Sequence, residues 1–300
     1  MTTPLLAKNT LPKRQDFRAS SRMRVRWAEV DLQKIVFNAH YLMYFDTAVA
    51  DYWRALAMSY EETMHQWGGD LYVKKASVEY FASARYEDQL DVMLKCVKVG
   101  TSSIVYHGAI FSADQLLVTS ELIYVYANPA TQTSQPVPSV FRELLNAFEG
   151  GEPMTIVKIG DVAALGADAF LIREEVFVNE QGFALDIEKD VFDATSVHAV
   201  AYNRLGKPLA TGRLLPSKVI DSVKSSKIGR MAVHRVMRGS NLGKDIMAAL
   251  LKAAHARGDT EVVLHSQCSA QNFYIKQGFT VRGEPFDEEG MQHIEMVKRL

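Results

Sequence analysis

The stretch Glu29–Leu56 reads EVDLQKIVFNAHYLMYFDTAVADYWRAL and decides how the first half of this chain folds. From Ala39 onward its apolar side chains recur at helical spacing in a wide stripe, which predicts a mostly buried helix over residues 39–57. Asp31 precedes Asn38 by seven residues at the polar start of the stretch. A packed core needs neither a carboxylate nor an amide there, so both residues are candidates for chemistry.

Strand-like runs lie on both sides of this helix in the sequence. Residues 25–28 alternate between apolar and polar, which predicts a strand. After the helix come LYVKKASVEYFA, DQLDVMLKCVKVG, SSIVYHGAIFS and LLVTSELIYVYA, which are rich in Val, Ile and Tyr and are separated by turn residues. One long apolar helix followed by an antiparallel meander predicts a sheet wrapped around a central helix.

The first half resembles a known family at its most informative stretch. VRWAEVDLQKIVFNAHYLMYFDTAVADYWR and SVEYFASARYEDQLDV are similar to the opening of hotdog-fold thioesterases of the 4-hydroxybenzoyl-CoA type, over about residues 22–145. The resemblance implies a hotdog domain that hydrolyses acyl-CoA thioesters. It implies Asp31 as the catalytic carboxylate and Asn38 at a position where members carry His or Asn. It also implies a homo-oligomer, a dimer or tetramer with the active site at the subunit interface.

These residue types suit thioester chemistry on physical grounds as well. A carbonyl oxygen docked on the Asn38 N–H, at the predicted helix N-terminus, would be polarised by a free donor and by the positive end of the helix dipole. Asp31 could attack the carbonyl carbon or activate a water molecule. The alternative for Asp31 is a turn-forming or capping acid, the common role of an isolated Asp. His40 is better explained as a polar residue at the helix start.

The chain divides midway. A polar segment, NPATQTSQPVPSV, leads into the short helical pattern FRELLNAFEG, and Gly150–Pro153 then form a helix stop and a turn. We therefore expect a first domain over residues 22–150 and a second over residues 151–300, each near the usual domain size.

The second domain contains a candidate phosphate-binding loop. FLIREEVFVNEQGF predicts a helix, HAVAYN and KPLATGRLLP predict a hairpin, and SKIGRMAVH predicts a further strand. RVMRGSNLGKDIMAALLKAAHARG then places a loop of small residues before an Ala/Leu-rich helix. Backbone N–H groups in such a loop can approach phosphate oxygens, and the helix dipole adds attraction. The alternative is an ordinary strand-to-helix turn.

This half resembles the ElaA-like branch of the GNAT superfamily, over about residues 154–300. The loop, SAQNFYIKQGF, IREEVFVNEQGF and EGMQHIEM carry the resemblance. It implies an α/β domain that transfers an acyl group, expected to be acetyl, from coenzyme A to an amine. The residues that it implies for coenzyme A binding are Met231, Val233, Arg238, Gly239, Asn241, Gly243 and Lys244. Asn241 replaces the middle Gly of the pattern, and Asn tolerates left-handed backbone.

Tyr274 falls on the Tyr of the GNAT pattern that protonates the departing thiolate. Its ordinary pKa of about 10 suits an acid at neutral pH, and the alternative is a packing aromatic. His265 and His293 could line an acceptor pocket, and Glu174, Glu175 or Glu180 could act as a base for an amine. Satisfied structural histidines and a helix-surface Glu are the simpler interpretations. No pair of histidines has metal-ligand spacing on one element, so no metal site is predicted.

Composition limits the classes of function. The 300 residues exceed one usual core, and a net charge of −1 favours neither nucleic acid nor an anionic membrane. No apolar run approaches the ~20 residues of a membrane span. Cys96 and Cys268 lie far apart, which fits a reducing, cytoplasmic setting. Residues 1–21 form a basic tail without the apolar segment of a secretory signal.

The sequence thus predicts an α+β protein with two acyl-CoA chemistries. A hotdog domain would hydrolyse acyl-CoA thioesters, and a GNAT domain would transfer an acyl group to a small-molecule or peptide amine. Coenzyme A and its thioesters would be substrates rather than tightly bound cofactors. Two alternatives stay open. REEVFVNEQGF and GRLLP also resemble N-acyl-homoserine lactone synthases, which transfer longer acyl chains. Either domain could instead hold acyl-CoA as a sensor without turnover.

Overall fold

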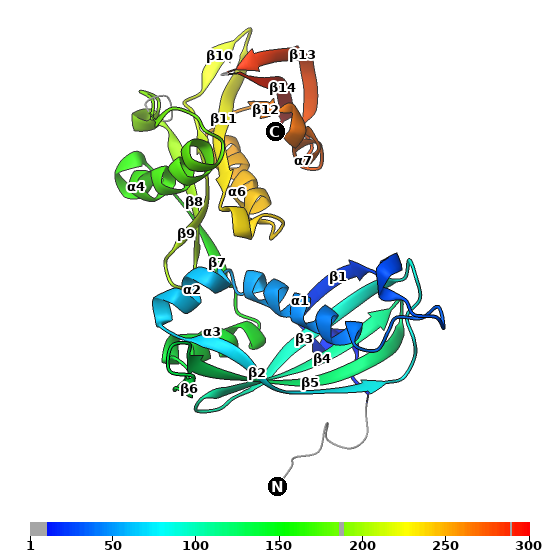
Figure 1. Ribbon diagram of the computed structural model, residues 1–300. Helices are drawn as coiled ribbons and strands as arrows, with labels where there is room; N and C mark the ends of the chain where they lie inside the picture. The colour runs from blue at the N-terminus through cyan, green and yellow to red at the C-terminus, as the bar shows by residue number, and fades with distance from the viewer. Residues whose placement is uncertain (1–10, 186–188, 289) are drawn as a thin grey trace. The chain divides into compact units, whose positions relative to one another are not determined.

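A computed structural model describes residues 11–185, 189–288 and 290–300. The chain forms two compact units, Met1–Met154 and Thr155–Leu300 (Figure 1). Both units combine helices with a largely antiparallel sheet, so the α+β class expected from the sequence is confirmed. Each unit is described by itself below.

The first unit is a curled antiparallel sheet with a long helix against one face. The strands run in the order β1-β3-β4-β5-β2, and β6 pairs with β5. Its strands are β1 (Ala19–Arg24), β2 (Asp70–Tyr80), β3 (Gln89–Val99), β4 (Ser103–Ser112), β5 (Gln115–Asn128) and β6 (Thr133–Ser134). Its helices are α1 (His40–Ala55), α2 (Tyr60–Trp67) and α3 (Ser139–Glu149). The helix expected over residues 39–57 is confirmed, and so are the four antiparallel strands. Only β3, β4 and β5 form a meander, because β2 pairs with β5 instead of β3.

Helix α1 buries its apolar stripe against the sheet, as Figure 1 shows. Phe45 is fully buried and packs directly over Gly108 of β4, where no side chain separates helix from sheet. Two turns further along, the Tyr52 hydroxyl donates to the Glu149 carboxylate of α3 over 2.6 Å. A second donor to that carboxylate is the Cys96 N–H of β3, at 2.8 Å. Apolar packing at one end and a shared carboxylate at the other therefore fix α1 on the sheet.

The strand expected over residues 25–28 is wrong. The strand is β1, Ala19–Arg24, which pairs with β3 and begins inside the segment expected to be a basic tail. The chain then forms a 3-10 helix over Trp27–Glu29. The buried Glu29 carboxylate accepts the Tyr44 hydroxyl at 2.7 Å and the Arg26 N–H at 2.8 Å. These bonds turn the chain toward α1. The alternation of apolar and polar residues over 25–28 cannot predict this turn, because it depends on contacts with Tyr44. Residues 1–10 of the expected tail lie outside the described residues.

The second unit is a larger sheet with helices on both faces. Its strand order is β13-β14-β12-β11-β9-β8-β7, and β10 pairs with β11. The strands are β7 (Thr155–Gly160), β8 (Val197–Asn203), β9 (Pro208–Leu214), β10 (Lys218–Ile220), β11 (Val223–Val233), β12 (Glu261–Gln267), β13 (Thr280–Glu288) and β14 (Met291–Arg299). The helices include α4 (Val162–Arg173), α6 (Leu242–Ala256) and α7 (Gln271–Ile275).

Both faces of β8 and β9 are buried because a helix covers each of them. Val200 and Tyr202 of β8 pack with Leu165 and Ala169 of α4. On the opposite face, a side chain at Gly212 of β9 would run into residues of α6. The strands predicted here as a hairpin are therefore the centre of a three-layer core.

The helix expected over residues 170–183 differs from the observed one in two respects. Helix α4 begins at Val162, where the Asp161 side chain accepts the Ala164 N–H at the N-cap. After Arg173 the chain continues as a π-helix over Glu174–Glu180. Arg173 is buried in an ion pair, so tertiary contacts hold this change of helical pitch. Within the described residues no helix has the length and apolar character to cross a membrane.

We expect Gly108→Ala to destabilise the first unit by about 1–3 kcal/mol, because the new Cβ would overlap Cε1 of Phe45 and overpack the helix–sheet contact. All three tryptophans, Trp27, Trp53 and Trp67, lie in this unit, so urea unfolding followed by tryptophan fluorescence measures it. The control is Gly229→Ala in the second unit, where an added Cβ meets no atom within 4 Å. An unchanged unfolding midpoint in Gly108→Ala would contradict the packing described.

Candidate functional site

The second unit has a gap in its sheet where the parallel strands β11 and β12 stop pairing. β11 and β12 are paired from Ser225↔Glu261 to Ile228↔Leu264, and the ladder ends there. Beyond this point β11 stays on β9 through a bulge between Gly229 and Ala232, whereas β12 stays on β14. Beyond Ile228 the edge of β11 that faces β12 therefore has no strand partner, so backbone groups of β11 such as those of Met231 are not paired with β12. Such groups need a polar partner.

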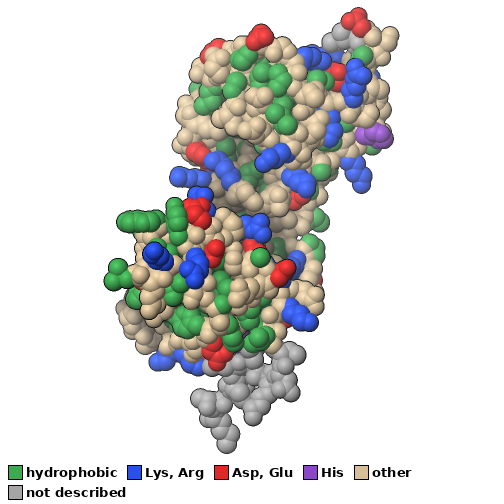
Figure 2. All heavy atoms as spheres, turned by 90° about the vertical axis from the view of Figure 1, so that its right-hand side faces the viewer, with side chains coloured by type: hydrophobic (Ala, Val, Ile, Leu, Met, Phe, Trp, Pro, Cys, Tyr) green, Lys and Arg blue, Asp and Glu red, His purple; other side chains and the backbone are tan. Residues whose placement is uncertain are grey.

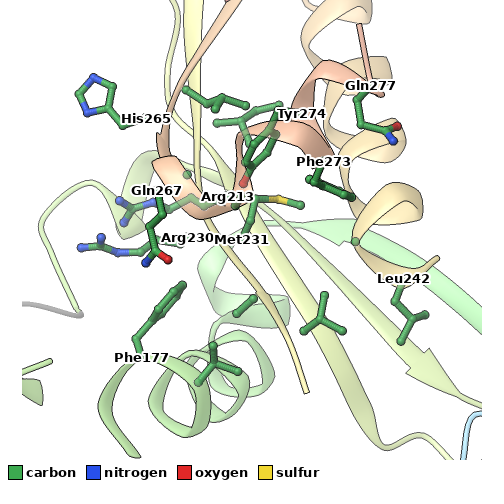
Figure 3. Close-up of a pocket in the computed structure, with 18 of the residues that line it drawn as sticks. Phe177, Arg213, Arg230, Met231, Leu242, His265, Gln267, Phe273, Tyr274 and Gln277 are labelled. Atoms are coloured by element: carbon green, nitrogen blue, oxygen red, sulfur yellow. The ribbon is translucent and has the colours of Figure 1, made fainter. Parts of the chain in front are cut away.

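A pocket of about 820 Å³ occupies this opening (Figure 3). Its volume falls in the range of small-molecule sites. Every residue of the second unit that the sequence analysis singled out for coenzyme A or thiolate lines this one pocket. They are Met231, Val233, Arg238, Gly239, Asn241, Gly243, Lys244 and Tyr274.

The loop before α6 has the backbone of an anion site. Asn241 adopts the left-handed conformation at φ 69°, and Gly239 does so at φ 84°. Helix α6 begins directly after, at Leu242, and the N–H groups of its first turn point out of the helix end toward the pocket side. Among the described residues no hydrogen bond is made to the Gly243 and Lys244 N–H groups. These donors and the helix dipole can receive phosphate oxygens.

Arg238 already has a partner in this structure. Its two terminal nitrogens donate to the two carboxylate oxygens of Glu180 over 2.6 Å each, and its Nε donates to the Val233 carbonyl over 3.2 Å. The hydrogen bond from Arg238 lowers the pKa of Glu180. The sequence analysis treated Glu180 as a surface residue of a helix. Glu180 is exposed at the end of the π-helix, as expected, and its ion pair with Arg238 ties that helix to the loop.

Tyr274 lies on α7 and its hydroxyl points into the pocket (Figure 3). Its ring packs edge-on against Phe273 and Phe279, so the packing role considered for it is also present. Burial raises the pKa of Tyr274 to about 12, which keeps the phenol protonated at neutral pH. Among the described residues the Tyr274 hydroxyl has no hydrogen-bond partner. It can therefore donate to a group in the pocket.

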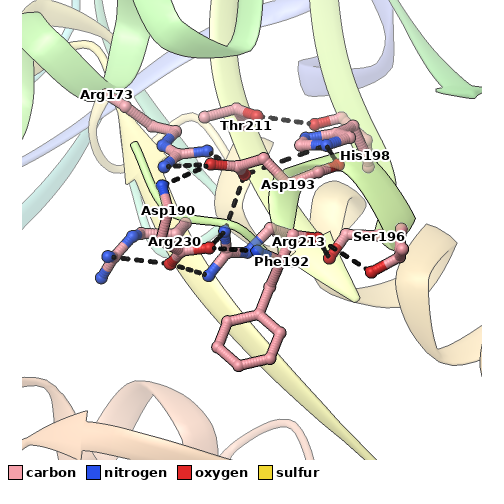
Figure 4. A network of polar contacts seen from close by, with 11 residues as sticks. Arg173, Asp190, Phe192, Asp193, Ser196, His198, Thr211, Arg213 and Arg230 are labelled. Carbon is pink, nitrogen blue, oxygen red and sulfur yellow. Dashed lines mark hydrogen bonds and ion pairs between the residues drawn. The ribbon is translucent and has the colours of Figure 1, made fainter. Parts of the chain in front are cut away.

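A network of buried charges forms another wall of the pocket (Figure 4). Asp193 accepts hydrogen bonds from Arg173 over 2.8 Å and from Arg213 over 2.7 Å. Arg213 also donates to both carboxylate oxygens of Asp190. Burial alone would raise the pKa of Asp193, but the bonds from the two arginines lower it to about 2. Sequence reasoning missed this network; the only local indication was an Arg within the otherwise apolar strand of Arg213.

A second group of titratable side chains lies on the strands that end at the opening. His265 Nδ1 is 2.9 Å from Lys227 Nζ and 2.8 Å from Glu288 Oε2. These three residues and His293 line the pocket. The sequence analysis weighed His265 and His293 as possible pocket residues and favoured a structural role. Lys227 and Glu288 were missed, because their proximity depends on the pairing of three strands.

In the first unit, Asp31 and Asn38 lie on the loop before α1. Asp31 Oδ1 accepts the Gln33 N–H at 2.8 Å, which is the turn-forming role considered for it. Helix α1 begins at His40, two residues after Asn38. The Asn38 carbonyl accepts the Tyr80 hydroxyl at 3.2 Å and the Tyr41 N–H at 3.4 Å. Its own N–H makes no hydrogen bond with a described residue. The free donor that a carbonyl would need is thus present at Asn38.

Large apolar side chains surround this loop and face outward. Leu32 is fully exposed, and Trp27 and Phe37 are 77% and 48% exposed. Leu42 and Met43 continue the apolar surface onto α1. Figure 2 shows further hydrophobic side chains on one face of this unit, between scattered charges. Exposed apolar groups gathered around polar candidates are typical of an interaction surface.

Two family models match the chain. The Thioesterase superfamily model matches residues 33–119, a range that contains Asn38 and begins two residues after Asp31. The Acetyltransferase (GNAT) domain model matches residues 190–300, which contain the loop before α6 and Tyr274.

Individual proteins are similar to one part of the chain at a time. An uncharacterized N-acetyltransferase of Bacillus subtilis, YjcF, is 37% identical over 132 residues, which cover 44% of this chain and 90% of that protein. The protein ElaA of Escherichia coli is 31% identical over 131 residues, 43% of this chain and 84% of its own. Among solved structures, a 1,4-dihydroxy-2-naphthoyl-CoA thioesterase from Synechocystis matches with a TM-score of 0.40 and 19% identity, over 42% of this chain and 94% of that chain.

We expect the second unit to lose about 2 kcal/mol of stability as the pH falls from about 5 to 2 through protonation of Asp193. The folded pKa of about 2 lies below the ordinary 3.8, so the contribution is complete above the unfolded value and is lost in acid. Pulse proteolysis with pepsin in urea, read on peptides of residues 190–300, measures it.

Asp193→Asn should weaken the unit and flatten this part of its pH dependence. The exposed Asp221→Asn is the control and should keep the wild-type slope. A wild-type slope in Asp193→Asn would show that other carboxylates carry the acid sensitivity.

Proposed function

The chain belongs to the GNAT acetyltransferase family through its second unit and carries a thioesterase-superfamily domain in its first, and from this premise we propose that it is a bifunctional acyl-CoA enzyme. The first unit would hydrolyse acyl-CoA thioesters. The second would transfer an acyl group, acetyl in the simplest case, to an amine. The observation that carries the proposal is the gathering of the loop before α6, the free edge of β11 and Tyr274 in one pocket.

Acyl transfer in the second unit would begin with the coenzyme A phosphates on the α6 N-terminus and Arg238. The edge of β11 at Met231 and Val233 has no partner in β12 and can pair with the amide groups of the pantetheine arm, as an added strand would, although the Val233 carbonyl already accepts the Arg238 Nε–H. A backbone N–H on this edge can also polarise the thioester carbonyl. When the amine attacks the carbonyl carbon and the C–S bond breaks, the Tyr274 phenol would protonate the thiolate.

Thioester hydrolysis in the first unit would use the loop before α1. The free Asn38 N–H would accept the thioester carbonyl oxygen, and Asp31 would attack the carbonyl carbon or activate a water molecule. The hydrogen bond from the Gln33 N–H does not exclude this role, because the other carboxylate oxygen of Asp31 stays available. We propose that a second copy of the chain covers the exposed apolar side chains around this loop and encloses the site.

We expect two substitutions to separate the activities. Asp31→Asn should lower acyl-CoA hydrolysis about 100-fold or more and leave transfer unchanged, because the amide is neither base nor nucleophile. Tyr274→Phe should slow transfer, since it removes the proton donor, and leave hydrolysis unchanged. A free-thiol assay with and without an amine panel measures both activities on the full chain.

Mass spectrometry of the products distinguishes the alternatives. Acylated amine in wild type but not in Tyr274→Phe supports transfer in the proposed pocket. Preference for long acyl chains would favour the homoserine-lactone-synthase-like reading. Tight acyl-CoA binding with no turnover by either unit would favour a sensor and end the enzyme proposal.

We also expect Glu180→Gln to tighten coenzyme A binding about 2–5-fold. The phosphates would compete with the Glu180 carboxylate for Arg238, and an exposed ion pair of this kind contributes about 0.5–1 kcal/mol. Calorimetry on the full chain measures the affinity. The matched control is Glu174→Gln, an exposed residue at the start of the same π-helix. Equal affinities for both variants would argue against a phosphate contact at Arg238.

A further inference from the structure

The group Lys227, His265 and Glu288 has no part in the binding of coenzyme A described above, although all three residues line the same pocket. They come from three different strands, β11, β12 and β13. Their contacts converge on one atom, His265 Nδ1, which lies 2.9 Å from Lys227 Nζ and 2.8 Å from Glu288 Oε2. An imidazole nitrogen carries either a hydrogen or a lone pair, so it cannot serve both neighbours in their ordinary charged forms.

The proton positions follow from this geometry. Glu288 is a carboxylate and can only accept, so Nδ1 must carry the hydrogen that it donates to Oε2. Burial opposes ionisation of Glu288, but the hydrogen bond from His265 lowers its pKa. With Nδ1–H directed at Glu288, a Lys227 ammonium 2.9 Å away would place donor against donor. The arrangement is satisfied when Lys227 is a neutral amine.

The surroundings of Lys227 favour the same state. No carboxylate of the described residues forms an ion pair with its Nζ. Burial lowers the pKa of Lys227, and the positive charges of Arg230 on its own strand and Arg213 on β9 lower it further. Glu288 on β13 and Glu295 on β14 act in the opposite direction, but neither reaches bonding distance.

Two further titratable side chains beside the group, Glu295 and His293, already have contacts of their own. Glu295 is 3.8 Å from His265 Nε2 and bonds to Arg282. His293 of β14 stacks on Phe286, which meets the His265 ring edge-on. The imidazole is therefore held in place by a carboxylate on one side and an aromatic ring on the other.

We propose that Lys227 is the general base of the second unit, and that His265, oriented by Glu288, is the positioning residue that keeps it neutral. Lys227 lies on β11 just before the bulge, and the edge of β11 beyond the bulge would hold the thioester. An amine bound in the pocket can therefore contact both the Lys227 side chain and the thioester. This inference rests on the proposed transfer to an amine and names the residue that prepares that amine.

The protons balance as follows. An acceptor that enters as an ammonium gives one proton to the Lys227 amine, which becomes an ammonium. The freed lone pair attacks the thioester carbonyl carbon, and the C–S bond breaks as the tetrahedral intermediate collapses. The departing thiolate takes the proton of the Tyr274 hydroxyl. The acceptor nitrogen loses a second proton as the amide forms, and this proton returns to the Tyr274 oxygen. Lys227 then releases its proton to solvent.

The test uses substitutions of Lys227 that distinguish the loss of a proton acceptor from the loss of a positive charge. Lys227→Met should lower kcat/KM for acyl transfer about 100-fold at neutral pH, with the deficit shrinking as the pH approaches the pKa of the acceptor amine. Lys227→Arg should fail to the same extent, since a guanidinium stays charged and cannot accept a proton. Exposed Lys218→Met on β10 is the matched control and should match wild type. Wild-type activity in Lys227→Arg would mean that the residue only attracts an anionic acceptor, and would overturn the proposal.

The positioning role predicts opposite shifts of the acidic limb of the pH–kcat/KM profile. His265→Gln leaves the Glu288 charge facing Lys227, which raises the lysine pKa and moves the limb to higher pH. Glu288→Gln removes that charge and moves the limb to lower pH. A purely structural role would lower the rate without opposite shifts, and that outcome would overturn the assignment of His265 and Glu288.

A measurement independent of catalysis separates this inference from the proposed function. Competitive labelling of the full chain with acetic anhydride over a pH series, read by mass spectrometry of peptides, gives the titration midpoint of each lysine. Lys227 should titrate well below Lys218. If wild type acylates no amine, the proposed transfer fails, while the Lys227 midpoint still decides whether it is a neutral amine at neutral pH. A midpoint equal to that of Lys218 would overturn the inference even in an active enzyme.

Discussion

The second unit depends on the point at which two parallel strands stop pairing. β11 and β12 share hydrogen bonds only as far as Ile228 and Leu264. Past that point β11 bends through a bulge, Arg230 takes a left-handed conformation, and the edge of the strand lines the pocket instead of pairing with β12. Unpaired backbone in a pocket is costly unless a ligand or solvent satisfies it. The proposed function places an extended polar chain, the pantetheine arm of coenzyme A, along this edge of β11, with the N–H groups of the loop before α6 at one end of the pocket.

Buried charge, rather than apolar packing alone, holds the wall of this pocket. Arg213 sits between Asp190 and Asp193, and Arg173 bonds to Asp193 from α4. Removing any one partner would leave an unpaired charge in the core, which is far more costly than the loss of one surface ion pair. The network fixes Asp190 and Phe192 beside the pocket. The second unit loses stability at low pH, where Asp193 takes up a proton.

The first unit is held together mainly by apolar and aromatic packing instead of buried charges. Helix α1 lies on the sheet through Phe45 and the bare backbone of Gly108, and aromatic rings fill the remaining space. The polar candidates Asp31 and Asn38 are left at the edge of this apolar core, on a loop with outward-facing apolar side chains. Under the proposed function, the two units would hold a thioester carbonyl in different ways: with a loop N–H and a carboxylate in the first unit, and with a strand edge and a phenol in the second.

The sequence by itself determined what local chemistry controls. The stripe that becomes α1 and the strands of the first unit follow from periodicity, while the small-residue loop with Asn241 and the place of Tyr274 follow from the resemblance to the GNAT family. Only the tertiary structure decided which distant residues meet. The start of β1 depends on pairing with β3, Arg238 finds Glu180 58 residues away, and Lys227 finds His265 38 residues away. Strand pairing and helix packing set these contacts, and a single sequence carries no local mark of them because the partners are selected by the whole sheet.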